Sequence, residues 1–324
     1  MNFYFAPLQG VTGHIFRNAY QEFFPHSISK YFSPFIAANQ SRSMKAKELT
    51  DILPENNQQI VLVPQLLTNN AADFTHTADK IKLLGYGEVN LNLGCPSGTV
   101  VAKYRGSGFL AKKEELNLFL EEIFAHATTK ISIKTRIGKD EPEEFYKLIE
   151  IFNQYPIEEL IIHPRLQRDF YNNKPNLQVF EDALKLSKNP VCYNGDIFTV
   201  QDYNALRTKF PSVETYMLGR GLLRNPGLIG EISQGAGVEK SLLKNFHDSV
   251  YHAYQKEYYG EKNVLYKMKE IWFYLISSFA DSEKYLKKIK KCERLSDYDI
   301  VVSALFSERE LVKTGSPLQQ TTLV

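Results

Sequence analysis

Eight short apolar segments alternate with amphipathic segments along the first two thirds of this chain, and this alternation restricts the fold more than any other feature. The apolar segments have the length and pattern of strands, and the segments between them have helical periodicity. Strands are expected at residues 3–8, 29–37, 60–67, 88–94, 131–138, 159–165, 190–196 and 215–222. The clearest helices are expected at residues 70–84, 113–127, 143–155 and 200–209. This order of elements predicts an α/β fold, a (β/α)8 TIM barrel.

An open doubly wound sheet is the alternative fold for the same alternation. Such a sheet is expected to carry a GxGxxG motif after its first strand, where this chain has Pro7, Leu8, Gln9 and Gly10. The barrel is therefore the fold that we predict.

The character of the chain changes after Gly235. Between residues 244 and 294 only helical periodicity is present, and eleven Lys and Arg residues stand against seven Asp and Glu residues. Lysine runs ordinarily mark a solvated helix face, but basic residues interleaved with aromatic ones also suit a phosphate backbone. We expect a catalytic barrel at residues 1–238, a smaller C-terminal helical bundle that binds RNA at 239–310, and a flexible polar tail at 311–324.

Composition and terminal sequence exclude several classes of protein. The chain has no run of about 18 apolar residues, so we expect no membrane span, and the N-terminal segment lacks the basic region of a signal peptide. Cys95, Cys192 and Cys292 lie too far apart for a metal-binding CxxC motif, and so sparse a set is typical of a reducing cytoplasm. The net charge of +2 is too small to indicate a nucleic-acid partner by itself.

The clearest sign of chemistry is a cysteine just beyond the fourth expected strand. That strand alternates apolar residues with Asn90 and Asn92, and Cys95 precedes Pro96. Because proline disfavours the α conformation in the residue before it, the thiol is expected on an extended turn. A lone cysteine is usually only a small buried apolar residue. The amides before this one, and the basic, glycine-rich loop after it, favour an active site instead.

Polar residues also collect at other strand ends, where barrels carry their functional groups. Lys134 and Arg136 are two residues apart on the fifth strand and therefore share a face. A lysine there is costly unless it meets an anion, and it suits a cofactor ring that becomes anionic when reduced. Gly195 and the run Gly219, Arg220 and Gly221 follow the seventh and eighth strands, which is the phosphate-binding position of many barrels.

At the level of these motifs the chain resembles the tRNA-dihydrouridine synthases, a family of flavin-dependent barrels. The motifs that carry the resemblance are, in order, APLQGVTGHIFR, VPQLL, VNLNLGCPSGTV, KYRGSGFLAK, ISIKTRIG, IIHPR, CYNGDI and MLGRGLLRNP. They span the barrel from end to end. The segments KMKEIWFYLISSF and LKKIKKCERLS resemble the family's C-terminal RNA-binding domain.

The resemblance implies FMN at the strand ends, with NADPH or NADH as reductant. The cofactor-binding positions that it implies are Pro7, Leu8, Gln65, Lys134, His163, Asn194, Gly195, Gly219 and Arg220. Cys95 matches the family's proton donor. The positions implied or expected on the substrate side are Asn92, Arg136, Tyr171, Lys103 and Arg105. Three departures from the family pattern fall on Leu8, Gly13 and Pro164. Leu8 is a conservative apolar exchange, whereas Gly13 and Pro164 bear on the shapes of their loops and not on the chemistry.

The implied reaction reduces a flipped-out uridine of the tRNA D-loop to 5,6-dihydrouridine, with hydride delivered to C6 and a proton from Cys95 to C5. We expect tRNA as partner, no metal, a monomer, and a preference for uridine 16. A flavin barrel that acts on a free pyrimidine, like the dihydroorotate dehydrogenases, is an alternative that the basic helical tail argues against. A non-catalytic tRNA-binding protein is a second alternative, and the set Cys95, Lys134 and Arg220 argues against it.

Overall fold

The computed structural model describes residues 1–25, 27–39 and 44–312, which form two compact units. The first unit comprises Met1–Pro7, Lys30–Gly195 and Phe210–Met217, and the second comprises Leu8–Ser29, Asp196–Lys209 and the residues from Leu218 on. Of the tail expected at 311–324, residues 313–324 lie outside the described part of the chain. The expected boundaries at 238 and 310 stay predictions.

The first unit contains a parallel sheet. All residues of its strands belong to this unit except Leu218, the last residue of β10. Its strands are β1 (Asn2–Phe5), β2 (Lys30–Phe32), β3 (Ile36–Ala37), β4 (Leu62–Val63), β5 (Gln65–Leu67), β6 (Glu88–Leu93), β7 (Lys130–Arg136), β8 (Leu160–His163), β9 (Val191–Asn194) and β10 (Thr215–Leu218). Every expected strand is present, but the second and third are each divided into two. Pro34 and Pro64 lie at these breaks, and a proline has no N–H for the strand ladder.

The strand order shows that the sheet closes on itself. It runs β3-β5-β6-β7-β8-β9-β10-β1-β2-β4. Because β2 and β3 are halves of one strand, and β4 and β5 are halves of the next, the two ends of this order belong to the same pair of strands. Eight strand positions therefore form the predicted barrel.

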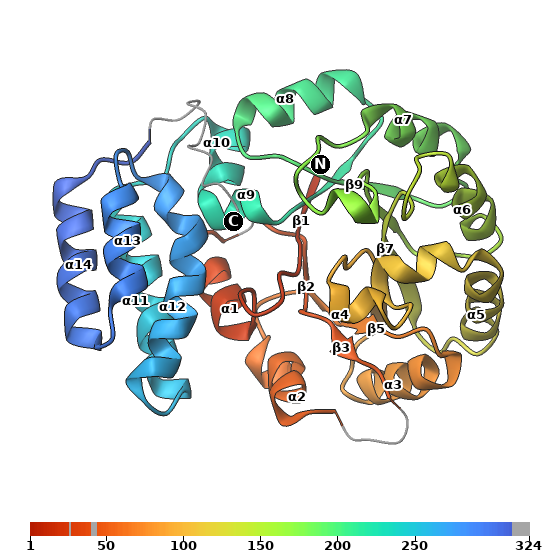
Figure 1. Ribbon diagram of the computed structural model, residues 1–324, viewed down its shortest axis with the longest axis horizontal. Helices are drawn as coiled ribbons and strands as arrows, with labels where there is room; N and C mark the ends of the chain where they lie inside the picture. Colours follow the sequence, from red (N-terminus) through yellow and green to blue (C-terminus); the bar gives the residue numbers. More distant parts are fainter. Residues whose placement is uncertain (26, 40–43, 313–324) are drawn as a thin grey trace. The chain divides into compact units, whose positions relative to one another are not determined.

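The barrel interior is packed with side chains. A buried cluster joins residues from β1, β2, β4, β8, β9 and β10, together with Ala6, just after β1; it consists of Tyr4, Ala6, Phe32, Val63, Ile161, Cys192 and Met217. Helices of the same unit surround the strands in Figure 1. They are α2 (Ala46–Ile52), α3 (Ala71–Leu83), α4 (Gly98–Val101), α5 (Lys113–Ala125), α6 (Glu144–Phe152) and α7 (Leu177–Leu186), with short 3-10 turns η1 (Pro54–Asn56), η2 (Gly106–Ala111) and η3 (Gln167–Asp169). Because side chains fill the interior, a ligand can bind only at the ends of the strands.

The second unit is helical. Its elements are α1 (His14–Phe23), α8 (Val200–Lys209), α9 (Arg220–Arg224), α10 (Leu228–Gln234), α11 (Lys240–Glu257), α12 (Glu261–Leu275), η4 (Ile276–Ser278), α13 (Glu283–Lys291) and α14 (Leu295–Glu308). Helix α1 packs on α11, where the rings of Phe16 and Tyr20 meet Phe246 edge to face. Among the residues that the structure describes, no helix is both long enough and apolar enough to cross a membrane.

Candidate active site

A series of buried side-chain amides connects β5, β6 and β7. Asn90 Nδ2 donates to the Ser132 hydroxyl at 2.9 Å, and Gln65 Nε2 donates to Asn90 Oδ1 at 2.8 Å. Asn92 Nδ2 in turn donates to Gln65 Oε1 at 2.7 Å. Each amide therefore has a fixed orientation, because its oxygen and nitrogen have different partners. Gln65 and Asn92 were predicted site residues, whereas Asn90 was not. Its position on the same face of the strand as Asn92 was the available signal.

The backbone of Cys95 is hydrogen-bonded to Asn92, the last amide of this series. Asn92 Oδ1 accepts the backbone N–H of Cys95 at 2.9 Å and that of Gly94 at 3.1 Å. The thiol is partly buried, and burial raises its pKa above the ordinary value, although the nearby charges of Arg136 and Lys134 oppose the shift. A thiol that keeps its proton at neutral pH can act as an acid.

The loop after α4 packs against Cys95. Ser107 donates to the Cys95 carbonyl oxygen from both its backbone N–H, at 3.1 Å, and its hydroxyl, at 2.8 Å. Gly106 has a φ of +55°, and a Cβ atom there would lie 2.8 Å from the same oxygen. Only glycine fits such an approach without displacing the backbone. Lys103, which is exposed, and Arg105, which is half-buried, come just before Gly106. Through Gly106 and Ser107, the predicted basic loop therefore lies beside Cys95.

Lys134 is a cation with no hydrogen-bonding partner among the residues that the structure describes. It is half-buried on β7, and no hydrogen bond or ion pair joins its ammonium group to any residue that the structure describes. Burial, and to a smaller extent the charge of Arg136, lowers its pKa to about 8. A cation held in this way is unfavourable unless it meets an electron-rich or anionic group. The residue therefore fits a ligand such as the reduced ring of a flavin.

Arg136 is almost fully buried and binds backbone. Its Nε donates to the Gly94 carbonyl at 2.9 Å, and its two terminal nitrogens donate to the carbonyls of Leu166 at 2.7 Å and Phe170 at 2.8 Å. The guanidinium also lies 5.5 Å from the ring centroid of the half-exposed Tyr171. Arg136 thus joins the turn of Cys95 to the loop after β8, a role that the sequence did not indicate.

His163, at the end of β8, is oriented by a second arginine. Arg165 Nη1 lies 2.9 Å from His163 Nε2, and since arginine can only donate, this ring nitrogen accepts. Arg165 Nε also donates to the Asn173 carbonyl at 2.6 Å. The ring of Tyr171 lies 6.1 Å from that of His163. Arg165 was not a predicted site residue, although its place two residues beyond His163 at a strand end could have indicated it.

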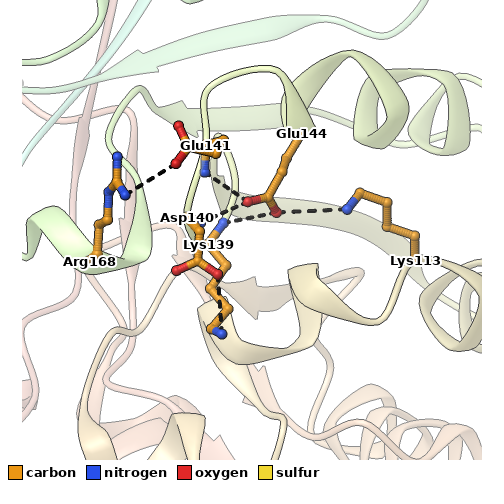
Figure 2. A network of polar contacts seen from close by, with 6 residues as sticks. All are labelled: Lys113, Lys139, Asp140, Glu141, Glu144 and Arg168. Carbon is orange, nitrogen blue, oxygen red and sulfur yellow. Dashed lines mark hydrogen bonds and ion pairs between the residues drawn. The ribbon is translucent and has the colours of Figure 1, made fainter.

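One carboxylate fixes the loop between β7 and α6. Although burial favours a raised value, three backbone N–H groups and Lys113 hold the pKa of Glu144 below its ordinary value. Figure 2 shows these contacts and the 3.3 Å ion pair that ties this loop to the one after β8; the residues drawn are Lys113, Lys139, Asp140, Glu141, Glu144 and Arg168. The loop after β7 and the loop after β8 are therefore joined by this surface ion pair.

The remaining predicted residues are divided between the two units. In the first, Pro7 is half-buried, and Asn194 Nδ2 donates to the Met217 carbonyl at 2.8 Å. A Cβ atom on Gly195 would overlap the Tyr193 hydroxyl. Leu8, Gly219 and Arg220 belong to the second unit.

Arg220 lies in a small cluster of its own unit. It forms a 2.6 Å ion pair with Asp196 and lies over the ring of Phe198. Arg224, which was not predicted, is buried over the same ring at 4.7 Å. Two guanidinium groups against one carboxylate leave this cluster positively charged, as a phosphate ligand requires.

Comparisons with known proteins show which family the whole chain resembles. The family model described as Dihydrouridine synthase (Dus) matches residues 4–310. A protein of Synechocystis named probable tRNA-dihydrouridine synthase 1 is 25% identical over 229 residues, which cover 70% of this chain and 63% of that protein. A Pseudomonas putida protein named tRNA-dihydrouridine(16) synthase is 26% identical over 251 residues, covering 75% of this chain and 76% of that one.

Solved structures agree with the barrel. Morphinone reductase superposes with a TM-score of 0.51 at 12% identity, covering 74% of this chain and 87% of that one. A variant of NCR from Zymomonas mobilis superposes with a TM-score of 0.52 at 15% identity, covering 76% and 90%. At such low identities the likeness concerns the fold alone.

Proposed function

Because the chain belongs to the dihydrouridine synthase family, we propose that it reduces a uridine of tRNA to 5,6-dihydrouridine, with FMN as its cofactor and NADPH or NADH as reductant. The observation that carries this proposal is the connected set of Gln65, Asn92 and Cys95, which places a protonated thiol at the end of an oriented amide chain. Such a set can hold a planar ring by its polar edge and protonate it from one face.

The first unit offers a suitable environment for the flavin ring. When bound, flavin supplies the hydride that C6 of the uracil receives. Lys134 has no hydrogen-bonding partner among the described residues, and its positive charge would stabilise negative charge on the ring. We propose that Gln65, Pro7, His163, Asn194 and Gly195 complete this environment. The assignments of Leu8, Gly219 and Arg220 to the cofactor rest on the family resemblance.

Cys95 is proposed as the acid that protonates C5. Its raised pKa keeps the thiol protonated at neutral pH, which an acid requires. Asn92 holds the backbone of Cys95 and is proposed to contact the uracil edge. Arg136 and Tyr171 are proposed on the uracil side, where Arg136 acts by fixing the turn and the loop that border the base.

The proposed substrate is tRNA, whose target base must leave its stack to reach the strand ends. In the first unit, Lys103 and Arg105 are suited to backbone phosphates. In the second, α13 buries Tyr285, Leu286 and Ile289 and exposes five lysines. These are Lys284, Lys287, Lys288, Lys290 and Lys291. The name of the Pseudomonas putida relative supports uridine 16 as the target.

A product assay tests the proposal against its alternatives. Purified protein is supplied with FMN, NADPH and either an unmodified tRNA transcript or orotate, and the products are analysed by mass spectrometry. We expect a gain of two hydrogens at a D-loop uridine, and none in a transcript with cytidine at position 16. Turnover of orotate alone would favour the alternative of a flavin barrel that acts on a free pyrimidine, like the dihydroorotate dehydrogenases. Binding of tRNA without any conversion would favour the non-catalytic one.

A further inference from the structure

Tyr104 occupies a backbone conformation that favours glycine. Helix α4 ends with hydrogen bonds from the Tyr104 N–H to the Val101 carbonyl, at 2.9 Å, and from the Arg105 N–H to the Val100 carbonyl, at 3.2 Å. This is the Schellman pattern, in which the residue that closes the helix adopts a positive φ and is usually glycine. Tyr104 has a φ of +50°. A bulky side chain in this region is disfavoured, so its presence calls for a compensating advantage.

Burial of the ring does not supply that advantage. The side chain of Tyr104 is 52% exposed, and the ammonium of Lys112 lies 5.1 Å from the centroid of its ring. Lys112 is also paired with Glu115 at 3.6 Å. A cation above an exposed aromatic ring contributes only modestly to stability. The strain at Tyr104 is therefore not explained by packing.

The loop around Tyr104 is held rigidly and carries positive charge. The side chain of Asn69 binds it at two points: Oδ1 accepts from Arg105 Nε at 3.3 Å, and Nδ2 donates to the Lys103 carbonyl at 3.2 Å. The segment from Lys103 to Lys112 contains no acidic residue. An exposed aromatic ring among cations on a fixed loop is the arrangement that binds unpaired nucleobases beside their phosphates.

The same loop meets the proposed acid. Two residues after Tyr104, Gly106 packs on the Cys95 carbonyl, and Ser107 donates to it. The loop of Tyr104 therefore lies against the turn that carries the proposed acid. The contact joins the position of Tyr104 to that of the reacting base.

We propose that Tyr104 is a stacking platform for an unpaired base of the RNA that neighbours the reacting uridine. The inference rests on the proposed function, since it takes tRNA as the substrate. The ring stacks on the base, while Lys103 and Arg105 bind the adjoining phosphates. The stability lost in the left-handed conformation is thus offset by RNA binding.

Three variants test this role: Tyr104→Gly, Tyr104→Phe and Arg105→Gln. Affinity for an unmodified tRNA transcript is measured over a range of salt concentrations, and thermal unfolding is measured in parallel. Tyr104→Gly is expected to bind tRNA about 5- to 150-fold more weakly, the range for loss of one stacked base, without a fall in melting temperature. Its salt dependence should match that of the wild type, because no cation is removed. Tyr104→Phe should bind like the wild type, whereas Arg105→Gln should reduce the salt slope by about one.

Two results would overturn the inference. One is a Tyr104→Gly variant that binds tRNA as tightly as the wild type. The other is a variant whose weaker binding comes with a clearly lower melting temperature, since that would make the tyrosine a structural residue. Failure of the wild type itself to bind tRNA would instead contradict the proposed function, so the two failures are distinguishable.

Discussion

The side-chain oxygen of Asn92 lies 2.9 Å from the backbone nitrogen of Cys95 and accepts its N–H. Asn92 is also hydrogen-bonded to Gln65, which lies on the neighbouring strand β5. The position of the thiol therefore depends on two strands of the sheet. The relationship turns a cysteine on a loop into a group of fixed position, as a proton donor requires.

The first prediction concerns Cys95. Replacement by alanine removes the proposed acid, so we expect dihydrouridine formation to slow about 10²- to 10⁴-fold while bound FMN is retained. Single-turnover conversion of tRNA by the reduced protein measures the rate, and visible absorption measures the flavin. Cys292→Ala serves as the matched control, because that cysteine lies in the helical unit. Equal rates for Cys95→Ala and Cys292→Ala would eliminate Cys95 as the acid.

A second prediction separates binding from stability at Lys134. Lys134→Met removes a cation that has no hydrogen-bonding partner among the described residues, so the flavin-free variant should melt at a higher temperature than the flavin-free wild type. Its affinity for FMN should fall. In the wild type, affinity for reduced FMN should weaken as the pH rises through about 8, where the ammonium loses its proton, and the variant should lack this dependence. Calorimetric titration at several pH values decides the matter; unchanged affinity in the variant would contradict the assignment.

The third prediction is a pH dependence of stability that arises at Glu159. Burial, with help from Glu88 and Glu158, raises the pKa of this carboxyl to about 7, against the opposing effects of Tyr4 and Lys30. The folded protein then binds more protons than the unfolded chain between pH 4.5 and 7, so the contribution is present at low pH and is lost as the pH rises through 7.

Glu159→Gln removes this titration. Relative to the wild type, its free energy of unfolding should increase with pH over the same interval, by up to about 3 kcal/mol. Denaturant unfolding of both proteins at pH 5 and pH 8 measures the difference, in which the other titrating groups cancel. A difference that does not change with pH would show that the carboxyl titrates normally.

A fourth prediction concerns the core of the helical unit. Trp272 Nε1 donates to the Tyr298 hydroxyl at 2.6 Å, and this hydroxyl in turn donates to His247 Nε2 at 2.6 Å. Tyr298→Phe leaves both nitrogens buried without this partner, which costs about 1–3 kcal/mol for each group. The free energy of unfolding should fall accordingly, and Tyr266→Phe, at an exposed tyrosine, provides the control. A Tyr298→Phe protein as stable as the control would contradict this account of the core.

The barrel could be predicted from sequence because its strands and helices differ in hydrophobic period, which is a local property. The two interrupted strands could have been anticipated from Pro34 and Pro64. The membership of residues Leu8–Ser29 in the helical unit could not, since it depends on contacts such as that of Phe16 with Phe246, far apart in the chain.

The candidate site was likewise predictable only in part. Residue types at strand ends indicated Cys95, Asn92 and Lys134. They did not indicate that Arg136 binds three backbone carbonyls, because the positions of those carbonyls depend on loops after two different strands. Nor did they indicate the strain at Tyr104, since a positive φ at a non-glycine residue leaves no mark in the sequence.

The visible absorption spectrum of the purified protein, recorded before and after NADPH is added under exclusion of air, tests the central claim most directly. We predict flavin bands that bleach with NADPH and return when unmodified tRNA is added. Bands that return with air but not with tRNA would contradict the proposed substrate, and a protein unable to take up FMN at all would contradict the proposed chemistry.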